Sequence, residues 1–294
     1  MTDTSRQDRV ERLLAERMAR SDRAIPARPA GPAPLSFIQH GLWLTWKMSD
    51  TPFAGCRPTA YRVRGPLDLQ LVKQVLDDVV ARHETLRTTY PMIDGTPMQV
   101  VGSPEPIELP VMDVSGEPHP EARADELAGE HVRRGFDLEH RPPFDPLLIR
   151  IGEDDHLLAI GVHHIIFDGW SELLLANELR VGLDRYSSRD RRPGELLPIQ
   201  YADFASWQRN HYDDESLASS LDFWRAKLSP LPDDLKLPAD GTEEWRRETR
   251  RVVFDPALSQ RLDAFARSMG ATTFMAIAAA VEILLARVAN QPDF

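Results

Sequence analysis

An apolar segment that ends in two histidines is the feature that most restricts how this chain can fold. Residues 156–165 are mostly small or apolar and follow no helix cap, which predicts a β-strand. Neighbouring side chains on a strand point to opposite faces, so His163 and His164 cannot both enter one site. Strand ends that face a cleft are where α/β enzymes place their chemistry. We therefore expect one working imidazole here and one packed, hydrogen-bonded imidazole.

The loop that follows this strand carries Asp168, Gly169 and Ser171. Glycine permits a turn at this place, and Ser171 can cap a helix over residues 172–186. Asp168 is expected to hold the loop by pairing with a cation from elsewhere in the chain, and not to contact a substrate.

Two arginines are candidates for the cation that pairs with Asp168. Arg87 is preferred, because residues 85–90 are predicted to form a strand whose less polar side chains point away from it. Arg82, near the end of the preceding helix, is the alternative. A buried Asp–Arg pair costs about 3–5 kcal/mol to break from one side, so loss of Asp168 is expected to impair folding as well as activity.

Composition excludes several classes of function. The 294 residues carry a net charge of −11, which argues against nucleic acid as the main partner. No apolar run is long enough to span a membrane, and the polar N-terminus is unlike a secretory signal, so we expect a cytoplasmic protein without a membrane partner. Cys56 is the single cysteine, which excludes an internal disulfide and a cysteine-rich metal site. No G-x-G-x-x-G or Walker loop supports nucleotide binding.

Three segments are predicted along the chain. They are residues 1–32, with a helix over 5–21 and a proline-containing linker, residues 33–190, which form a first lobe, and residues 191–294, which form a linker and a second lobe. Further strands are predicted over 59–64, 98–101, 147–152 and 249–254, and further helices over 121–134, 202–210, 215–228 and 256–268. Strands and helices mix without strict alternation, which predicts a mixed α+β sandwich within the α/β class.

The helix predicted over residues 272–288 is apolar on several faces and should therefore be buried. Few strands are expected after residue 190 to cover it. The second lobe is therefore expected to be incomplete in this chain.

Four motifs occur in an order that resembles the condensation domains of nonribosomal peptide synthetases, in the chloramphenicol-acetyltransferase-like superfamily. They are residues 35–43 (LSFIQHGLW), 82–88 (RHETLRT), 163–171 (HHIIFDGWS) and 201–209 (YADFASWQR). The third motif contains the His-His-x-x-x-Asp-Gly signature of that family. The resemblance extends from about residue 33 to the end, with Gly41 standing where family members usually carry arginine.

The resemblance implies two similar lobes with an active-site tunnel between them, the first complete here and the second partial. The implied reaction is amide formation, in which the amine of an aminoacyl acceptor attacks a donor acyl or peptidyl thioester and the thiol leaves. Both substrates ride on phosphopantetheine arms of carrier proteins, so the implied domain binds no cofactor directly. The implied partners are the upstream donor and downstream acceptor peptidyl carrier proteins, and the adenylation domain of the same synthetase.

The resemblance also implies roles for residues of the third motif. His164 contacts the attacking amine, either as a general base or by orienting the amine and stabilising the tetrahedral intermediate, while His163 is the support. Gly169 is either a simple turn residue or the source of an N–H that faces the developing oxyanion. A metal site at His163, His164 and Asp168 is conceivable by ligand type, but the alternating strand faces argue against it.

Three more residues are expected to support the structure around the site. Trp170 is expected to pack in the core or between the lobes. Tyr201 and Asp203 are expected to form hydrogen bonds at the junction to the second lobe.

Two other classes of function remain open. A coenzyme-A-dependent O- or N-acyltransferase shares the His-x-x-x-Asp element, although the second and fourth motifs favour the synthetase branch. A non-catalytic recruitment module or inert fragment is the other alternative. The intact His164 and Asp168 argue against a degenerate module, whereas the incomplete second lobe argues for inactivity of this chain by itself.

Overall fold

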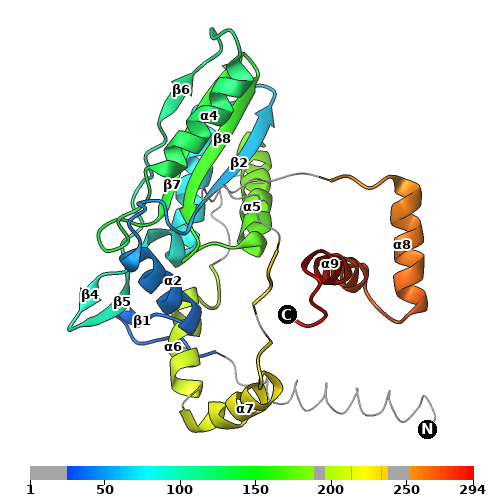
Figure 1. Cartoon of the computed structure of the whole chain (residues 1–294). Helices are drawn as coiled ribbons and strands as arrows, with labels where there is room; N and C mark the ends of the chain where they lie inside the picture. Colours follow the sequence, from blue (N-terminus) through cyan, green and yellow to red (C-terminus); the bar gives the residue numbers. More distant parts are fainter. Residues whose placement is uncertain (1–24, 189–195, 213, 233, 238–251) are drawn as a thin grey trace. The chain divides into compact units, whose positions relative to one another are not determined.

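The computed structural model describes residues 25–188, 196–212, 214–232, 234–237 and 252–294 (Figure 1). The helix predicted over 5–21 lies outside the described residues, as does the beginning of the strand predicted over 249–254. Contacts divide the chain into two compact units, residues 1–214 and 215–294, and each unit is described by itself.

A four-stranded sheet in the order β2-β8-β7-β6 lies at the centre of the first unit (Figure 1). Its strands are β2 (Cys56–Arg64), β8 (Asp155–His163), β7 (Phe144–Gly152) and β6 (Val111–Asp113). β8 pairs antiparallel with both β2 and β7, and β6 runs parallel to β7. The strand predicted over 156–165 is therefore present and ends at His163.

Helices cover both faces of this sheet. They are α4 (Pro120–Arg133) on one face, and α3 (Leu69–Arg82) and α5 (Gly169–Ser187) on the other (Figure 1). Leu157 and Ala159 of β8 join the core beneath α4, whereas Leu158, Ile160 and Val162 join the core beneath α3 and α5. Burial on both faces explains why this strand is mostly apolar instead of alternating with polar residues. The predicted mixed α/β class is confirmed.

A smaller sheet and two helices complete the described part of the first unit. The elements are β1 (Ala33–Pro34), β5 (Thr96–Val101), β3 (Thr88–Thr89), β4 (Met92–Ile93), α2 (Phe37–Met48) and α6 (Tyr201–His211). The strand predicted over 85–90 is wrong for its first half, which belongs to a 3-10 turn, η1 (Glu84–Arg87). The Thr88 hydroxyl stabilises this turn by donating to the Glu84 carbonyl over 2.7 Å.

Helix α6 belongs to the first unit, although residues 191–294 are predicted from the sequence to form a linker and a second lobe. The Arg209 side chain donates to the Leu35 carbonyl over 2.7 Å, and the Gln208 side chain accepts from the Phe37 N–H over 3.0 Å. These bonds join α6 to the beginning of the first unit, so the boundary between the compact units falls after α6.

The second unit is helical in its described part. Its helices are α7 (Asp214–Lys227), which begins at the boundary, α8 (Pro256–Ser268) and α9 (Thr273–Ala289). The described residues of the second unit do not provide the burial expected for residues 272–288, because α9 contains no buried residue and Phe274 is 79% exposed. Helix α8 packs against α9, and a single helix covers only one face of a helix that is apolar on several. Residues 252–254, the described end of a predicted strand, form no strand.

Among the described residues, no helix by itself is long and apolar enough to cross a membrane. The pair α8 and α9, which meet at a bend of 98°, reaches that length and apolarity only when both are taken together.

Candidate active site

His163 is sealed inside the protein at the end of β8. Its side chain is buried, and its Nδ1 accepts a hydrogen bond from the Ile165 N–H over 3.0 Å. Gly55 lies so close to the ring that a Cβ at this position would stand 2.5 Å from Nε2. Burial, aided by the neighbouring His164, lowers the pKa of His163 to about 4, so this ring is neutral at pH 7.

Stability is expected to fall in acid because of His163. Its pKa is about 4 in the folded chain, whereas an unfolded histidine titrates at about 6.5. The unfolded state therefore binds the extra proton first, and the stabilisation present above about pH 6.5 declines as the pH falls towards 4. Urea unfolding should show a shallower decline for His163→Asn, whose amide oxygen also accepts the Ile165 N–H. Equal pH dependence in the two proteins would contradict this assignment.

His164 has different surroundings, as the alternation of side chains along a strand predicts. Its N–H donates to the Gly55 carbonyl over 2.8 Å, and its Nδ1 lies 2.7 Å from the Phe167 carbonyl oxygen. A carbonyl oxygen only accepts, so Nδ1 carries the hydrogen and the neutral ring keeps its lone pair on Nε2. The ring is therefore held in one orientation and one tautomer, with a nitrogen that can accept a proton.

A cavity of about 520 Å³, the main cavity, brings the four sequence motifs together. Its lining includes Ile38 and Gln39 of the first motif, His83 and Thr85 of the second, His164, Asp168 and Ser171 of the third, and Tyr201 of the fourth. Motifs that lie far apart in the sequence thus surround the half-buried imidazole of His164, and the His83 imidazole lines the same cavity.

Gln39 connects the first motif to the histidine loop. Ser36 and Gln39 form a capping box at the start of α2, in which each side chain accepts a hydrogen bond from the other residue's N–H. The buried Nε2 of Gln39 also lies 3.2 Å from Gln99 Oε1 and 3.3 Å from the Ile165 carbonyl, next to His164. The local pattern predicts the cap, but no local pattern signals the contact to a carbonyl so distant in the sequence.

The first residues of α5 differ from the prediction. The helix begins at Gly169 and is capped by Asp168, not by Ser171. Asp168 Oδ1 accepts hydrogen bonds from the Ser171 N–H over 2.8 Å and from the Ser171 hydroxyl over 2.7 Å. These bonds to Ser171 hold the pKa of Asp168 below its usual value.

The predicted ion pair between Asp168 and Arg87 is wrong, and so is the alternative with Arg82. Arg87 lies in the 3-10 turn, not in a strand, and donates to the Gly102 carbonyl. Arg82 pairs with Glu178 of α5 over 3.0 Å. Asp168 therefore stabilises the loop through the helix terminus, where a carboxylate satisfies free N–H groups.

Replacing Asp168 by alanine is expected to lower the free energy of unfolding by about 1 kcal/mol, the usual cost of losing an N-cap. A broken buried ion pair would cost about 3–5 kcal/mol instead. Asp168→Asn should keep most of the stability, because asparagine caps helices about as well as aspartate. Urea unfolding of the two variants checks this expectation, and a loss of about 3 kcal/mol in Asp168→Asn would favour the ion pair.

Gly169 and Trp170 are also placed differently from the expectation. Gly169 is the first residue of α5, and its φ lies outside the left-handed region. The backbone at this position therefore does not require glycine. The possible role of its N–H towards an oxyanion stays a prediction. Trp170 is 70% exposed on the first unit, so packing in the core of this unit is wrong, and packing between lobes stays a prediction.

Tyr201 and Asp203 form their hydrogen bonds within the first unit. The Tyr201 hydroxyl lies 3.0 Å from Ser36 Oγ, at the start of α2. The buried Asp203 carboxylate accepts from the Arg28 N–H over 3.1 Å and from Arg28 Nη1 over 2.8 Å. Both residues thus join α6 to the beginning of the described chain, and their role at the junction to a second lobe stays a prediction.

One cluster beside the main cavity is not predicted from the sequence. His83 Nε2 lies 2.9 Å from both carboxylate oxygens of Glu178, which also accepts from Arg82. Arg82 and His83 belong to the second motif, whereas Glu178 lies on α5. The packing of α3 against α5 brings the three together. Within the described residues, no three His, Cys, Asp or Glu side chains are grouped so that they could hold a metal ion.

Comparison with known proteins places this chain in one family. The family model described as "Condensation domain" matches residues 30–294. A linear gramicidin synthase of Brevibacillus parabrevis is 34% identical over 277 residues, which cover 92% of this chain and 5% of that protein. Phosphinothricin tripeptide synthetase PhsC of Streptomyces viridochromogenes is 35% identical over 292 residues, which cover 96% of this chain and 27% of that protein. The chain therefore corresponds to a small part of these relatives.

Solved structures support the same fold. The X-domain from teicoplanin biosynthesis is 27% identical, with a TM-score of 0.71 over 90% of this chain and 59% of that chain. The first condensation domain of the CDA synthetase has a TM-score of 0.75 at 20% identity, over 89% of this chain and 63% of that chain. These matches agree with the chloramphenicol-acetyltransferase-like architecture expected from the motifs.

Proposed function

Because this chain belongs to the condensation-domain family, we propose that it takes part in nonribosomal peptide synthesis as an acyltransferase that forms amide bonds. The donor is an acyl or peptidyl thioester, and the acceptor is the amine of an aminoacyl thioester. Both are carried on phosphopantetheine arms of peptidyl carrier proteins, one upstream and one downstream. The adenylation domain of the same synthetase loads an amino acid, and the condensation domain binds no cofactor directly. The cytoplasmic location expected from the sequence stays a prediction.

The observation that carries this proposal is the fixed His164 ring on the wall of the main cavity. Its Nδ1–H is committed to the Phe167 carbonyl, so Nε2 is the nitrogen that is free to accept a proton. The acceptor nitrogen attacks the thioester carbonyl carbon, the C–N bond forms, and the C–S bond breaks. The nitrogen loses a proton and the leaving sulfur gains one, and Nε2 accepts and returns that proton.

Positioning contributes more than proton transfer. Holding two tethered substrates in line is worth about 7–11 kcal/mol, whereas a positioned general base contributes about 10²–10⁴-fold in rate. The hydrogen bonds that His164 donates to the Gly55 and Phe167 carbonyls fix the residue and its imidazole, and Gln39 supports the loop at Ile165. His163 is the neutral, buried support beneath this loop.

Reconstitution tests the proposal against a coenzyme-A-dependent acyltransferase. The full-length polypeptide that contains this chain is supplied with an acyl-loaded donor carrier and an aminoacyl-loaded acceptor carrier. The mass of the acceptor carrier is then measured by intact-protein mass spectrometry. Transfer of the acyl group to the acceptor carrier is expected, with little transfer when acyl-coenzyme A or a free amine replaces a loaded carrier. Faster transfer from acyl-coenzyme A to a free alcohol or amine would contradict the proposal.

The second candidate function is non-catalytic, in which the domain only recruits another protein. One solved neighbour, at 27% identity and a TM-score of 0.72, is an X-domain in complex with OxyB. A main cavity lined by an oriented imidazole favours catalysis over recruitment, because binding alone needs no free Nε2. Absence of any transfer between fully loaded carriers would favour recruitment.

A further inference from the structure

The main cavity has a smaller neighbour. This side cavity measures about 90 Å³ and shares five lining residues with the main cavity: His83, Thr85, Ile166, Phe167 and Ser171. Phe167 is also the residue whose carbonyl holds the His164 imidazole. The side cavity therefore lies against the wall of the main cavity that positions His164.

The lining of the side cavity is mostly apolar and carries no unpaired charge. Its apolar part consists of Val79, Leu86, Ile166, Phe167, Leu174 and Leu175. Glu178 also lines it, but this carboxylate is neutralised by Arg82 at 3.0 Å and by the hydrogen bond from His83 at 2.9 Å. A ligand group that enters this space is therefore recognised by apolar contact and by size, and not by its charge.

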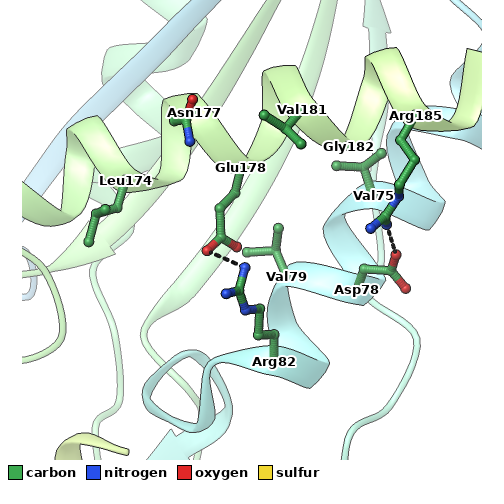
Figure 2. Close-up of a pocket in the computed structure, with 10 residues that line it drawn as sticks. All are labelled: Val75, Asp78, Val79, Arg82, Leu174, Asn177, Glu178, Val181, Gly182 and Arg185. Atoms are coloured by element: carbon green, nitrogen blue, oxygen red, sulfur yellow. Dashed lines mark hydrogen bonds and ion pairs between the residues drawn. The ribbon is translucent and has the colours of Figure 1, made fainter. Parts of the chain in front are cut away.

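On its far side the side cavity meets a groove between α3 and α5. The groove measures about 310 Å³ and is bridged by the Arg82–Glu178 and Asp78–Arg185 ion pairs (Figure 2). Val79, Leu174 and Glu178 line both the groove and the side cavity. Leu174 projects from α5 at this shared wall and is 47% exposed (Figure 2). Its side chain thus helps to separate the two spaces without being part of the buried core.

On the basis of the proposed function, we propose that the side cavity receives the side chain of the acceptor aminoacyl group and that Leu174 limits the size of that side chain. The acceptor nitrogen must lie within hydrogen-bond distance of His164 for the imidazole to act on it. The carbon that carries the acceptor side chain is bonded to this nitrogen, whereas the donor side chain begins one bond beyond the carbonyl carbon. The side cavity adjoins Phe167, which holds the His164 ring, so the side chain that it receives is that of the acceptor.

The volume of the side cavity determines which acceptor side chains it can hold. A dry apolar cavity of roughly 150 Å³ accommodates benzene, and the side cavity, at about 90 Å³, is smaller. It accepts small aliphatic side chains, such as those of alanine and valine, and excludes the phenyl group of phenylalanine. Truncation of Leu174 joins the side cavity to the groove and makes room for a larger group.

Competition between acceptors tests this inference in the full-length polypeptide. Alanyl, valyl and phenylalanyl groups are loaded on the acceptor carrier in turn, with one constant donor, and the initial rates of transfer are compared. The unaltered protein should use alanyl and valyl acceptors in preference to phenylalanyl. Leu174→Ala should raise the rate with phenylalanyl relative to valyl by about tenfold or more, the range expected when a pocket gains space for apolar atoms.

Leu173→Ala is the matched control. Leu173 is the preceding leucine on α5, is 64% exposed, and lines neither the side cavity nor the groove. Its replacement should leave the ratio of phenylalanyl to valyl within about twofold of the unaltered protein. An equal shift in both variants would overturn the inference, and so would a shift in donor preference in Leu174→Ala without a shift in acceptor preference.

The two proposals fail in different ways. If the unaltered protein transfers acyl groups and Leu174→Ala leaves the acceptor ratio unchanged, the assignment of the side cavity is wrong while the proposed function stands. If the unaltered protein transfers nothing between loaded carriers, the proposed function is wrong and the assignment of the side cavity falls with it.

Discussion

Replacing His164 by alanine is expected to lower the rate of amide formation by about 10²–10⁴-fold, the usual contribution of a positioned acid–base group. The ring has a free Nε2 because its Nδ1–H is donated to the Phe167 carbonyl. The half-buried side chain lines the main cavity, so its truncation leaves little apolar surface uncovered. The rate of acyl transfer between loaded carriers measures the loss, and thermal unfolding should show that the fold is kept.

His140→Ala is a suitable control for this variant. His140 is an exposed histidine of the same unit, it pairs with Asp137, and it lies outside the lining of the main cavity. Its replacement should change neither the rate nor the unfolding temperature appreciably. Unchanged product formation by His164→Ala would remove His164 from the mechanism, and the proposed reaction would then depend on positioning of the two substrates alone.

Gly55→Ala is expected to reduce both the stability of the first unit and the rate of condensation. Gly55 has a φ of +75°, a conformation that costs a non-glycine residue about 1–3 kcal/mol. An added Cβ would stand 2.5 Å from Nε2 of His163, a buried ring with little room to move. Relief of this overlap adds about 1–3 kcal/mol. The Gly55 carbonyl also accepts the His164 N–H, so its displacement moves the imidazole that faces the main cavity.

Gly95→Ala separates the backbone effect from the contact with His163. Gly95 has nearly the same φ, +78°, but no atom of the described residues lies within 4 Å of an added Cβ. The Gly95→Ala variant should therefore lose only the stability that the left-handed conformation costs a non-glycine residue. Its condensation rate should be unchanged. Urea unfolding and the carrier assay measure the two effects. An equal loss of stability in both variants would show that the contact between Gly55 and His163 is unimportant.

Local patterns predicted those elements whose hydrogen bonds and burial are themselves local. The capping box of Ser36 and Gln39 is present at the start of α2, and Asp68, a residue type that favours the N-cap position, caps α3. His163 and His164 have the different surroundings that a two-residue strand period predicts, although β8 ends at His163 and His164 lies in the turn that follows. The four motifs also indicated the family, since their order and spacing are properties of the sequence itself.

Predictions failed where the deciding contact joins distant residues. The local pattern predicts a strand at Arg87, but a 3-10 turn stabilised by the Thr88 hydroxyl is present there, and the arginine donates to the Gly102 carbonyl and does not reach Asp168. Helix propensity and apolar patterning do not encode which carbonyl or carboxylate lies nearby after packing. The position of α6 shows the same limit, because the bonds of Asp203 to Arg28 are formed between segments far apart in the sequence.

The amino-acid sequence alone therefore determined the apolar β8 strand, the capping box at the start of α2, and the motif order that identifies the family. Tertiary structure decided that Glu178 joins the second motif, and that a side cavity lies beside Phe167, whose carbonyl holds the His164 ring. The physical reason is that strand alternation and helix caps depend on neighbours a few residues away. Cavities and ion pairs depend instead on side chains that only the packing of α3 against α5 brings together.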